Sequence, residues 1–261
     1  MVHFVGAGPG APDLITVRGL ALIREADVII YAGSLVNPVL LKEAKDSCEI
    51  YNSAFMTLEE VLSVMLDAQA AGKMTVRLHT GDPSLYGAVR EQMDLLAQHG
   101  ISCDVCPGVS SFCAAAASLQ AEYTLPEVSQ SVVITRLAGR TAVPEEESIE
   151  SFAAHGATMV IFLSAGMMRE LSERLMAGGY PADTPAAIVY KATWPQEKIV
   201  RCRLADLAEH AEAENITKTA LIVVGNVLGD AYGKSRLYDA SFSTEYRPAA
   251  KENTGMEDAE I

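Results

Sequence analysis

The chain has 261 residues, 49% of them hydrophobic, and a formal net charge of −14 at neutral pH. Because phosphate binding requires clustered Lys and Arg, this charge and the lack of a basic run argue against a nucleic-acid partner. No apolar stretch reaches the ~20 residues that cross a bilayer, so we expect no membrane segment. The N-terminus lacks the basic and long apolar regions of a signal peptide, so we expect a cytoplasmic protein.

The first part of the chain alternates strand-like and helical patterns. The predicted strands cover residues 2–6, 27–32, 48–52, 74–80 and 101–107. Between them, apolar residues recur at helical intervals in 15–26, 37–45, 57–72 and 83–100. Near-continuous apolar strands separated by helices are typical of a parallel sheet that helices cover on both faces. We therefore predict an N-terminal α/β domain over residues 1–120.

A second unit follows the stretch 123–126, which has the character of a domain link. Its predicted strands cover residues 131–137, 158–164, 185–192, 198–204 and 219–225. Helices lie between them, the last at 205–214. The connection 193–197 is too short for a parallel crossover, so the strands on either side of it should be antiparallel. We predict a mixed C-terminal α/β domain over residues 125–233 and a polar tail over residues 234–261.

The cysteines and histidines do not form a metal-binding pattern. Five cysteines are an odd number in a large chain, which suits free thiols in a reducing compartment. Cys103 and Cys106 form a CxxC, but no second CxxC or histidine pair completes a zinc site. Residues three apart in a strand point to opposite faces, so we expect both cysteines to be structural. We predict no metal site.

The motif GAGPGA at 6–11 directly follows the first predicted strand and matches the dinucleotide fingerprint GxGxxG/A. Pro9 and Pro12 remove two backbone donors from the loop that would hold the phosphates. The second strand ends in YAGS, which has no acidic residue to bind a ribose hydroxyl. An NAD(P)-dependent oxidoreductase is therefore a weaker hypothesis. A noncatalytic ligand-binding module, which rests on the absence of an obvious acid/base set, is a second weaker hypothesis.

The motif TGDPSLYG at 80–87 lies where a buried strand ends, and ligands of open α/β sheets bind beyond the carboxyl ends of the strands. Gly81 allows the backbone to turn close to a ligand, and the Asp82 carboxylate could meet a cationic group. Pro83 can begin the next helix. In the alternative interpretation, Asp82 and Pro83 are only the N-cap and first residue of that helix.

Four motifs in a fixed order, GAGPG, TGDPSLYG, PGVSS and KATWPQEKIV, resemble those of the S-adenosylmethionine-dependent tetrapyrrole methylases. The resemblance covers residues 1 to about 233. The stretches HTGDPSLYGAVREQM, TRLAGRTAVPEEES and VYKATWPQEKIVR are most similar to members that methylate C11 of precorrin-4 or cobalt-precorrin-4 in cobalamin (vitamin B12) synthesis. Methylation at another position of a corrin precursor, or of uroporphyrinogen III, is the alternative. Where the family often has an acid after GAGPG, this chain has Ala11.

The resemblance implies two α/β domains with the active site in the cleft between them, usually in a homodimer. It implies S-adenosyl-L-methionine as co-substrate. The cofactor-binding residues that it implies are Pro9, Thr80, Gly81, Asp82, Leu85, Ser110, Ser111, Leu163, Ala192 and Ala220.

The implied substrate carries several carboxylates, which need cationic anchors. Arg136, Arg140 and Lys191 are the candidates, and the alternative is that each is an ordinary surface charge. A sulfonium methyl is already activated and a ring carbon with enamine character is a competent nucleophile, so positioning can supply much of the acceleration. We assign no catalytic base, and the sequence leaves open whether the substrate already carries cobalt.

Overall fold

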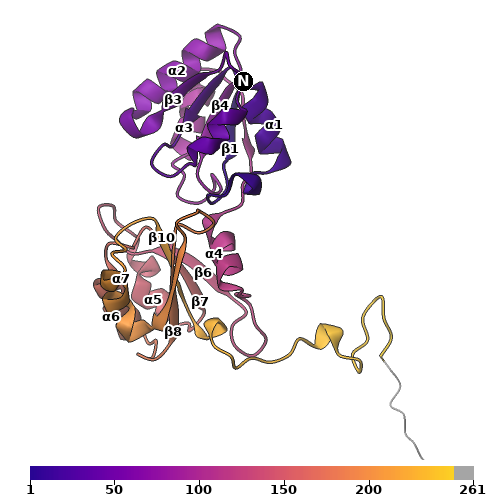
Figure 1. Ribbon diagram of the computed structural model, residues 1–261, viewed down its shortest axis with the longest axis vertical. Helices are drawn as coiled ribbons and strands as arrows, with labels where there is room; N and C mark the ends of the chain where they lie inside the picture. Colours follow the sequence, from indigo (N-terminus) through magenta and orange to yellow (C-terminus); the bar gives the residue numbers. More distant parts are fainter. Residues whose placement is uncertain (250–261) are drawn as a thin grey trace, which may run out of the picture.

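The computed structural model describes residues 1–249, which form two α/β units, each built on a five-stranded sheet (Figure 1). The first sheet has the strand order β3-β2-β4-β1-β5, and every neighbouring pair is parallel. Its strands are β1 (Val2–Gly6), β2 (Val28–Tyr31), β3 (Glu49–Asn52), β4 (Thr75–His79) and β5 (Cys103–Cys106). The predicted parallel sheet is confirmed.

Helices cover both faces of the first sheet because successive strand residues point to opposite sides. Phe4 packs with α2 (Leu58–Ala70) and α3 (Arg90–Gln98), whereas its neighbour Val5 packs on the side of α1 (Val17–Glu25). Cys103 and Cys106 also pack on opposite faces, as predicted, and none of the five cysteines forms a disulfide.

The second sheet has the order β6-β7-β10-β8-β9 and is mixed, as predicted. The β6–β7 pair is parallel and the other neighbours are antiparallel, including the β8–β9 pair that the short connection predicts. Its strands are β6 (Val132–Arg136), β7 (Thr158–Phe162), β8 (Pro185–Tyr190), β9 (Lys198–Arg203) and β10 (Ala220–Val224).

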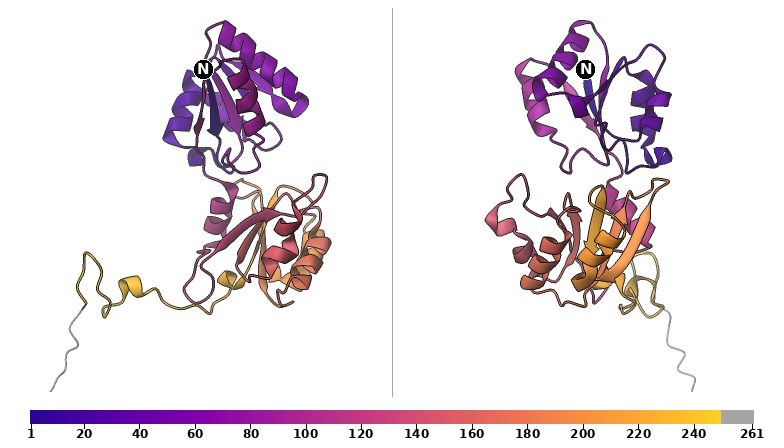
Figure 2. Two further views of the ribbon diagram at one scale, coloured as in Figure 1. Left: turned by 180° about the vertical axis from the view of Figure 1, so that it is seen from behind. Right: turned by 60° about the vertical axis from the view of Figure 1, so that its left-hand side comes forward.

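The helix α4 (Ser111–Leu119) packs on one face of the second sheet, where Ala115 and Leu119 meet Val160 and Val189. The opposite face is covered by α5 (Ile149–Ala153), α6 (Met168–Ala177) and α7 (Leu207–Ala213). Figures 1 and 2 show α4 beside the second sheet. By packing, α4 therefore lies with the second unit, although the predicted division of 1–120 and 125–233 assigns it to the first.

Two predicted helices differ from the structure. Residues 37–45 contain a 3-10 helix, Pro38–Glu43, in place of an α-helix. The helix predicted over 83–100 begins only at Arg90, because Tyr86 and Ala88 have left-handed backbone conformations with φ of 54° and 48°. A right-handed helix cannot contain such residues. The prediction that Pro83 begins this helix is therefore wrong.

Residues 234–249 leave the second unit and extend away from it, with a single 3-10 turn at Arg236–Tyr238 (Figure 2). The rest of the predicted tail, residues 250–261, lies outside the described residues. Across residues 1–249, no helix is both long enough and apolar enough to span a membrane.

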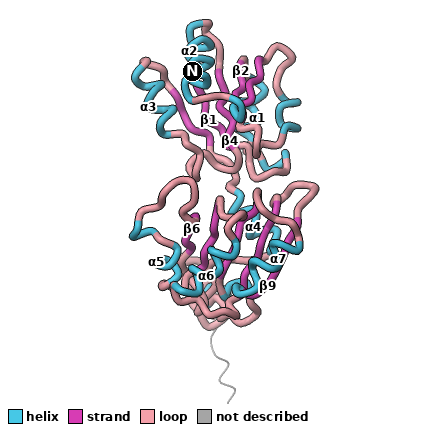
Figure 3. Tube along the Cα trace, turned by 90° about the vertical axis from the view of Figure 1, so that its left-hand side faces the viewer, coloured by secondary structure: helices cyan, strands magenta, loops and turns pink. Residues whose placement is uncertain are grey.

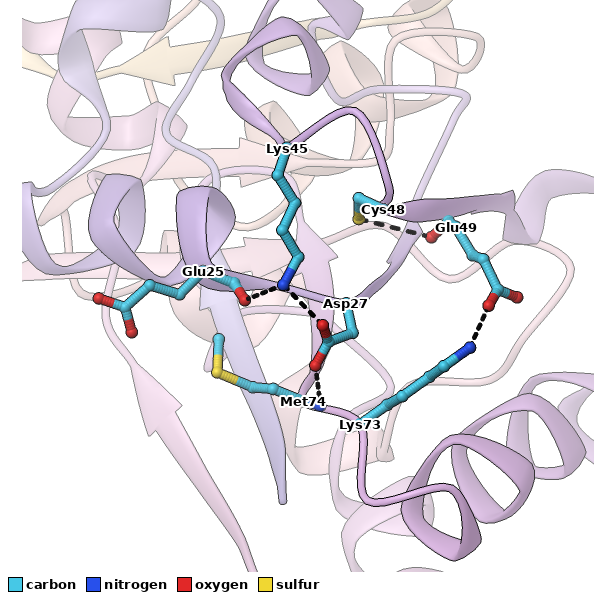
Figure 4. A network of polar contacts seen from close by, with 7 residues as sticks. All are labelled: Glu25, Asp27, Lys45, Cys48, Glu49, Lys73 and Met74. Atoms are coloured by element: carbon cyan, nitrogen blue, oxygen red, sulfur yellow. Dashed lines mark hydrogen bonds and ion pairs between the residues drawn. The ribbon is translucent and has the colours of Figure 1, made fainter.

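Ion pairs hold the edge of the first sheet at which its strands begin (Figure 4). Asp27, just before β2, accepts hydrogen bonds from Lys45 Nζ at 2.6 Å and from the Met74 N–H at 2.8 Å. These two bonds hold the pKa of Asp27 below its usual range. Lys73, just before β4, pairs with Glu49 of β3. This cluster joins three strands at the end of the sheet opposite to the candidate site.

Candidate functional site

The candidate site begins at the carboxyl edge of the first sheet, where the loops after β1, β4 and β5 meet. These strands are parallel neighbours, so their carboxyl ends share one edge. The chain leaves β1 toward the face of α1 and leaves β4 toward the face of α3. Such a switch between faces is where open α/β sheets bind ligands. Two backbone hydrogen bonds between Gly8 and Gly81 bridge the two loops, with N···O distances of 3.2 and 2.8 Å.

Three glycines let the loops touch backbone to backbone. A Cβ on Gly6 would lie 2.6 Å from Gly108 Cα and 2.6 Å from the Gly81 carbonyl oxygen. A Cβ on Gly108 would also collide with the Gly81 oxygen. No larger residue fits at either position, so the spacing of these loops is fixed by the absence of side chains.

Asp82 joins the loop after β4 to the loop after β5. One carboxylate oxygen accepts a hydrogen bond from the Gly108 N–H at 2.8 Å, and the other accepts from the N–H and hydroxyl of Ser84. Burial disfavours the charged form, but the bonds from Ser84 and Gly108 outweigh it and lower the pKa of Asp82. The carboxylate thus caps a turn, and the interpretation of Asp82 as a helix N-cap is wrong.

The amino end of α4 lies against this loop. Ser110 is buried at the N-cap position of α4 without a side-chain capping bond, and a Cβ on Gly81 would lie 3.5 Å from the Ser111 nitrogen. The first N–H groups of a helix lack intrahelical partners and attract negative charge. The contact of Gly81 with the start of α4 brings together the predicted residues Thr80, Gly81, Ser110 and Ser111. Leu85 follows Gly81 in the same loop and is half-buried.

The backbone of the glycine-rich loop after β1 is already hydrogen-bonded within the protein. Gly8 donates to Gly81, Ala11 donates to Thr193 Oγ1 at 2.9 Å, and Pro9 has no N–H. The Pro9 carbonyl accepts from Trp194 Nε1 at 3.1 Å, and the Gly10 carbonyl accepts from Asn37. A pyrophosphate needs free N–H groups, so this loop does not support the dinucleotide hypothesis.

The second sheet presents one edge toward these loops (Figure 3). Strands β6, β7 and β8 end at that edge, and β9 and β10 begin there. Three of the predicted cofactor residues lie along it: Leu163 after β7, Ala192 after β8 and Ala220 at the start of β10. Leu163 is 64% exposed and has a left-handed backbone with φ of 52°. An exposed leucine in a rarely adopted conformation is a feature that functional sites favour.

An aromatic pair connects the two units on the side of the loop 83–89. The Tyr86 and Phe162 ring centroids lie 5.4 Å apart, with the rings tilted by 47°. Six residues of this loop line an open cavity of about 720 Å³ together with the start of α3 and Val105: Pro83, Ser84, Tyr86, Gly87, Ala88 and Val89. The loop thus contacts the second unit through Tyr86 and also lines an open cavity.

The three predicted substrate anchors have different surroundings. The Arg136 guanidinium, at the end of β6, donates to the carbonyls of Thr141 at 3.1 Å and Ala142 at 2.6 Å, and so shapes the loop that follows it. Arg140 lies within that loop and is exposed. Lys191 Nζ lies 5.5 and 5.7 Å from the ring centroids of Tyr190 and Trp194. The structure therefore places all three residues at one edge of the second sheet, where some of the Arg136 donors are already hydrogen-bonded to backbone carbonyls.

Two buried ionisable side chains on β4 were not singled out from the sequence. Arg77 donates to Gln92 Oε1 at 3.1 Å and to the Ile30 carbonyl at 3.2 Å, and burial lowers its pKa to about 10. Burial, with the nearby Arg77 charge, lowers the pKa of His79 to about 3, so the imidazole is neutral. Within residues 1–249, His79 Nε2 is buried without a hydrogen-bond partner. In the sequence VRLHT, Arg77 and His79 alternate with apolar residues of a buried strand, and this alternation could have identified them.

Thr193 and Trp194 were also missed as individual residues, although the motif that contains them was recognised. Their contacts with Pro9 and Ala11 join segments more than 180 residues apart. Among residues 1–249, no group of three or more His, Cys, Asp or Glu side chains is arranged to hold a metal ion.

Comparisons of the sequence and of the structure with known proteins all identify tetrapyrrole methylases. A model of the family described as tetrapyrrole (corrin/porphyrin) methylases matches residues 1–208. The cobalt-precorrin-4 C(11)-methyltransferase of Methanocaldococcus jannaschii is 55% identical over 251 residues, which cover 96% of this chain and 97% of that protein. The X-ray structure of a cobalt-precorrin-4 methyltransferase of cobalamin biosynthesis matches with a TM-score of 0.86 at 46% identity, over 88% of this chain and 96% of that chain.

A uroporphyrin-III C-methyltransferase from Thermus thermophilus, solved in complex with S-adenosylhomocysteine, matches with a TM-score of 0.72 at 27% identity. That match covers 87% of this chain and 92% of the other. The shared fold, the fixed order of the loop motifs and the family match over residues 1–208 lead to one conclusion: this chain belongs to the tetrapyrrole (corrin/porphyrin) methylase family.

Proposed function

We propose that this protein is an S-adenosylmethionine-dependent methyltransferase that methylates C11 of cobalt-precorrin-4 or precorrin-4 in cobalamin biosynthesis. The observation that carries the proposal is the 55% identity to a cobalt-precorrin-4 C(11)-methyltransferase across 96% of this chain. The site agrees with this chemistry because its loops offer backbone and apolar surface with few ionisable groups, which suits transfer of an activated methyl.

S-adenosylmethionine is the proposed co-substrate, bound where the loops of the first sheet face the edge of the second. The amino end of α4 suits its carboxylate, and exposed Leu163 offers apolar surface to its adenine. The proposed contacts are Pro9, Thr80, Gly81, Asp82, Leu85, Ser110, Ser111, Leu163, Ala192 and Ala220. Asp82 contributes mainly by fixing the loop after β4, because its oxygens are hydrogen-bonded to Gly108 and Ser84.

The co-substrate supplies a sulfonium methyl, and in the reaction the C–S bond breaks as the new C–C bond forms, with sulfur retaining the electron pair. The residues of this chain then have to bind both reactants and orient them in line, which can supply much of the acceleration. We assign no catalytic base to the chain.

Arg140 and Lys191 are proposed to bind carboxylates of the tetrapyrrole. Arg136 is proposed to act in the same region, both by shaping the loop that carries Arg140 and by donating its remaining N–H groups. A guanidinium has five N–H donors, so its bonds to Thr141 and Ala142 leave capacity for a substrate carboxylate.

We further propose that the protein acts in the cytoplasm as a homodimer. Its five free cysteines suit a reducing compartment. Exposed apolar side chains on the first unit, including Phe55 at 86% exposure and Ile50 at 43%, favour burial in a subunit interface. Light scattering on the purified protein tests the dimer, and a monomeric mass would reject it.

Incubation with a panel of tetrapyrroles tests the substrate assignment. The purified protein, S-adenosylmethionine and one of cobalt-precorrin-4, precorrin-4 or uroporphyrinogen III are combined, and product masses are measured. We expect a single methyl to be added to one or both of the first two. Methylation of uroporphyrinogen III alone would identify a different member of the family.

A further inference from the structure

The turn between β8 and β9, residues 191–197, reaches from the second unit to the glycine-rich loop of the first. Thr193 Oγ1 accepts a hydrogen bond from the Ala11 N–H at 2.9 Å, and Trp194 Nε1 donates to the Pro9 carbonyl at 3.1 Å. The Trp194 ring lies against Gly10 so closely that a Cβ there would collide with it. Three consecutive loop residues are thus held by two residues of the turn.

These contacts carry most of the polar connection between the units. Within residues 1–249, they are the two hydrogen bonds that join the segment 1–109 to the segment 111–249. The aromatic contact of Tyr86 with Phe162 is non-polar and lies at a different loop. The relative position of the glycine-rich loop and the second sheet therefore depends on Thr193 and Trp194.

The turn is itself rigidly held. The Glu197 carboxylate accepts hydrogen bonds from the Thr193 N–H and from the Ser118 hydroxyl, the latter at 2.7 Å. Thr193 has a left-handed backbone with φ of 68°, which a β-branched residue adopts only where its surroundings hold it there. Because Ser118 belongs to α4, the turn is anchored to the helix whose amino end lies at the candidate site.

We propose that Thr193 and Trp194 are positioning residues, which lock the glycine-rich loop onto the second unit and so keep the two halves of the S-adenosylmethionine site in one binding-competent arrangement. This inference rests on the proposed function, since the proposed cofactor contacts come from both units. A protein whose competent arrangement is only partly populated binds its ligand more weakly in proportion. Loss of either interdomain hydrogen bond should therefore weaken cofactor binding without removal of any group that touches the cofactor.

Matched variants of the full chain test the proposal by calorimetric titration with S-adenosylhomocysteine. Thr193→Val removes the acceptor for Ala11 while it keeps the shape, and Trp194→Phe removes the donor to Pro9 while it keeps a ring against Gly10. Each should raise the Kd about five- to tenfold, the usual worth of one hydrogen bond. Thr193→Ser, which retains the hydroxyl, should restore binding to within about twofold of wild type.

The control is Thr57→Val, remote from the site, where the lost hydroxyl accepts a backbone N–H as the N-cap of α2. It should lower the Tm by about 2–4 °C and leave the Kd unchanged. Hydrogen exchange gives a second measurement that needs no ligand: the Ala11 amide should be protected in wild type and exchange faster in Thr193→Val.

If the wild-type protein binds S-adenosylhomocysteine and both Thr193→Val and Trp194→Phe bind it with the same Kd, the positioning proposal is overturned and the proposed function is left intact. An equal loss of affinity in Thr57→Val would also overturn it, because the effect would then follow global stability. Failure of the wild-type protein itself to bind S-adenosylhomocysteine at millimolar concentration would instead reject the proposed function.

Discussion

The carboxylate of Asp82 accepts a hydrogen bond from the backbone N–H of Gly108 at 2.8 Å, and this bond ties together the loops that follow β4 and β5. The same side chain also receives the N–H and hydroxyl of Ser84. Because three donors converge on one carboxylate, the loop with the sequence GDPS is preorganised without a ligand.

Asp82→Asn should lower both the free energy of unfolding and the affinity for S-adenosylhomocysteine. An amide cannot accept from all three donors, because its NH₂ group would face one of them. We expect a loss of about 1–3 kcal/mol in unfolding free energy and a weaker Kd, measured by denaturation and calorimetry. The control is Asp94→Asn, which breaks an exposed pair with Arg90 and should cost less than about 1 kcal/mol. An Asp82→Asn protein as stable as wild type would contradict the assigned role.

The contribution of Asp82 to stability should depend on pH. Its pKa in the folded protein is below the ordinary value of 3.8. A carboxyl with a depressed pKa stabilises the folded state fully above its unfolded pKa, and this stability is lost as the pH falls through the folded pKa. The difference in unfolding free energy between wild type and Asp82→Asn should thus be constant from pH 5 to 7 and shrink below about pH 4. A difference that grows on acidification would show that the sign is wrong.

Arg140→Lys should impair use of the tetrapyrrole and leave cofactor binding unchanged. Lysine keeps the charge but cannot donate two parallel hydrogen bonds to a carboxylate. We expect KM for the tetrapyrrole to rise about tenfold, with S-adenosylhomocysteine affinity within error of wild type. The matched control is Arg24→Lys in the exposed pair with Glu43. If Arg140→Lys and Arg24→Lys behave alike, Arg140 is an ordinary surface charge.

Arg136→Lys should differ from Arg140→Lys because the Arg136 guanidinium also holds the carbonyls of Thr141 and Ala142. We expect faster hydrogen exchange in residues 137–142 as well as a higher tetrapyrrole KM. Unchanged exchange in this loop would show that the two backbone contacts do not shape it.

Gly10→Ala should lower the free energy of unfolding and weaken cofactor binding, because the added Cβ conflicts with Trp194. A Cβ at this position overlaps the indole ring, so either the loop or the ring must move. Replacement of the indole by a smaller side chain, as in Gly10→Ala combined with Trp194→Leu, should recover part of the lost stability. A double-mutant cycle on unfolding free energy measures this coupling, and strict additivity would contradict the contact.

The strands and most helices could be predicted because their signals are local. β10 is an unbroken apolar run, ALIVV, and α2 carries a complete capping box in Thr57 and Glu60. The loop 83–89 could not be predicted, because the left-handed conformations of Tyr86 and Ala88 occur at residues with no intrinsic preference for them. The Tyr86 ring instead packs against Phe162 of the second unit, a contact that no local pattern in the sequence encodes.

The candidate site was predictable only in part for the same reason. Ordered motifs after successive strands placed Gly81 and Ser110 at one sheet edge. The bond between Trp194 and Pro9 spans 185 residues and has no periodic signal in the sequence. Likewise, the Ala-rich composition of α4 does not reveal which sheet it covers, whereas its packing on Val160 and Val189 does.

The position of the transferred methyl tests the central claim most directly. The purified protein is incubated with S-adenosylmethionine that carries a ¹³C-methyl group and with cobalt-precorrin-4 or precorrin-4, and the product is analysed by NMR. We predict one labelled methyl, bonded to C11, in at least one of the two products. A label at any other ring carbon, or no transfer to either compound by protein that binds S-adenosylhomocysteine, would contradict the assignment.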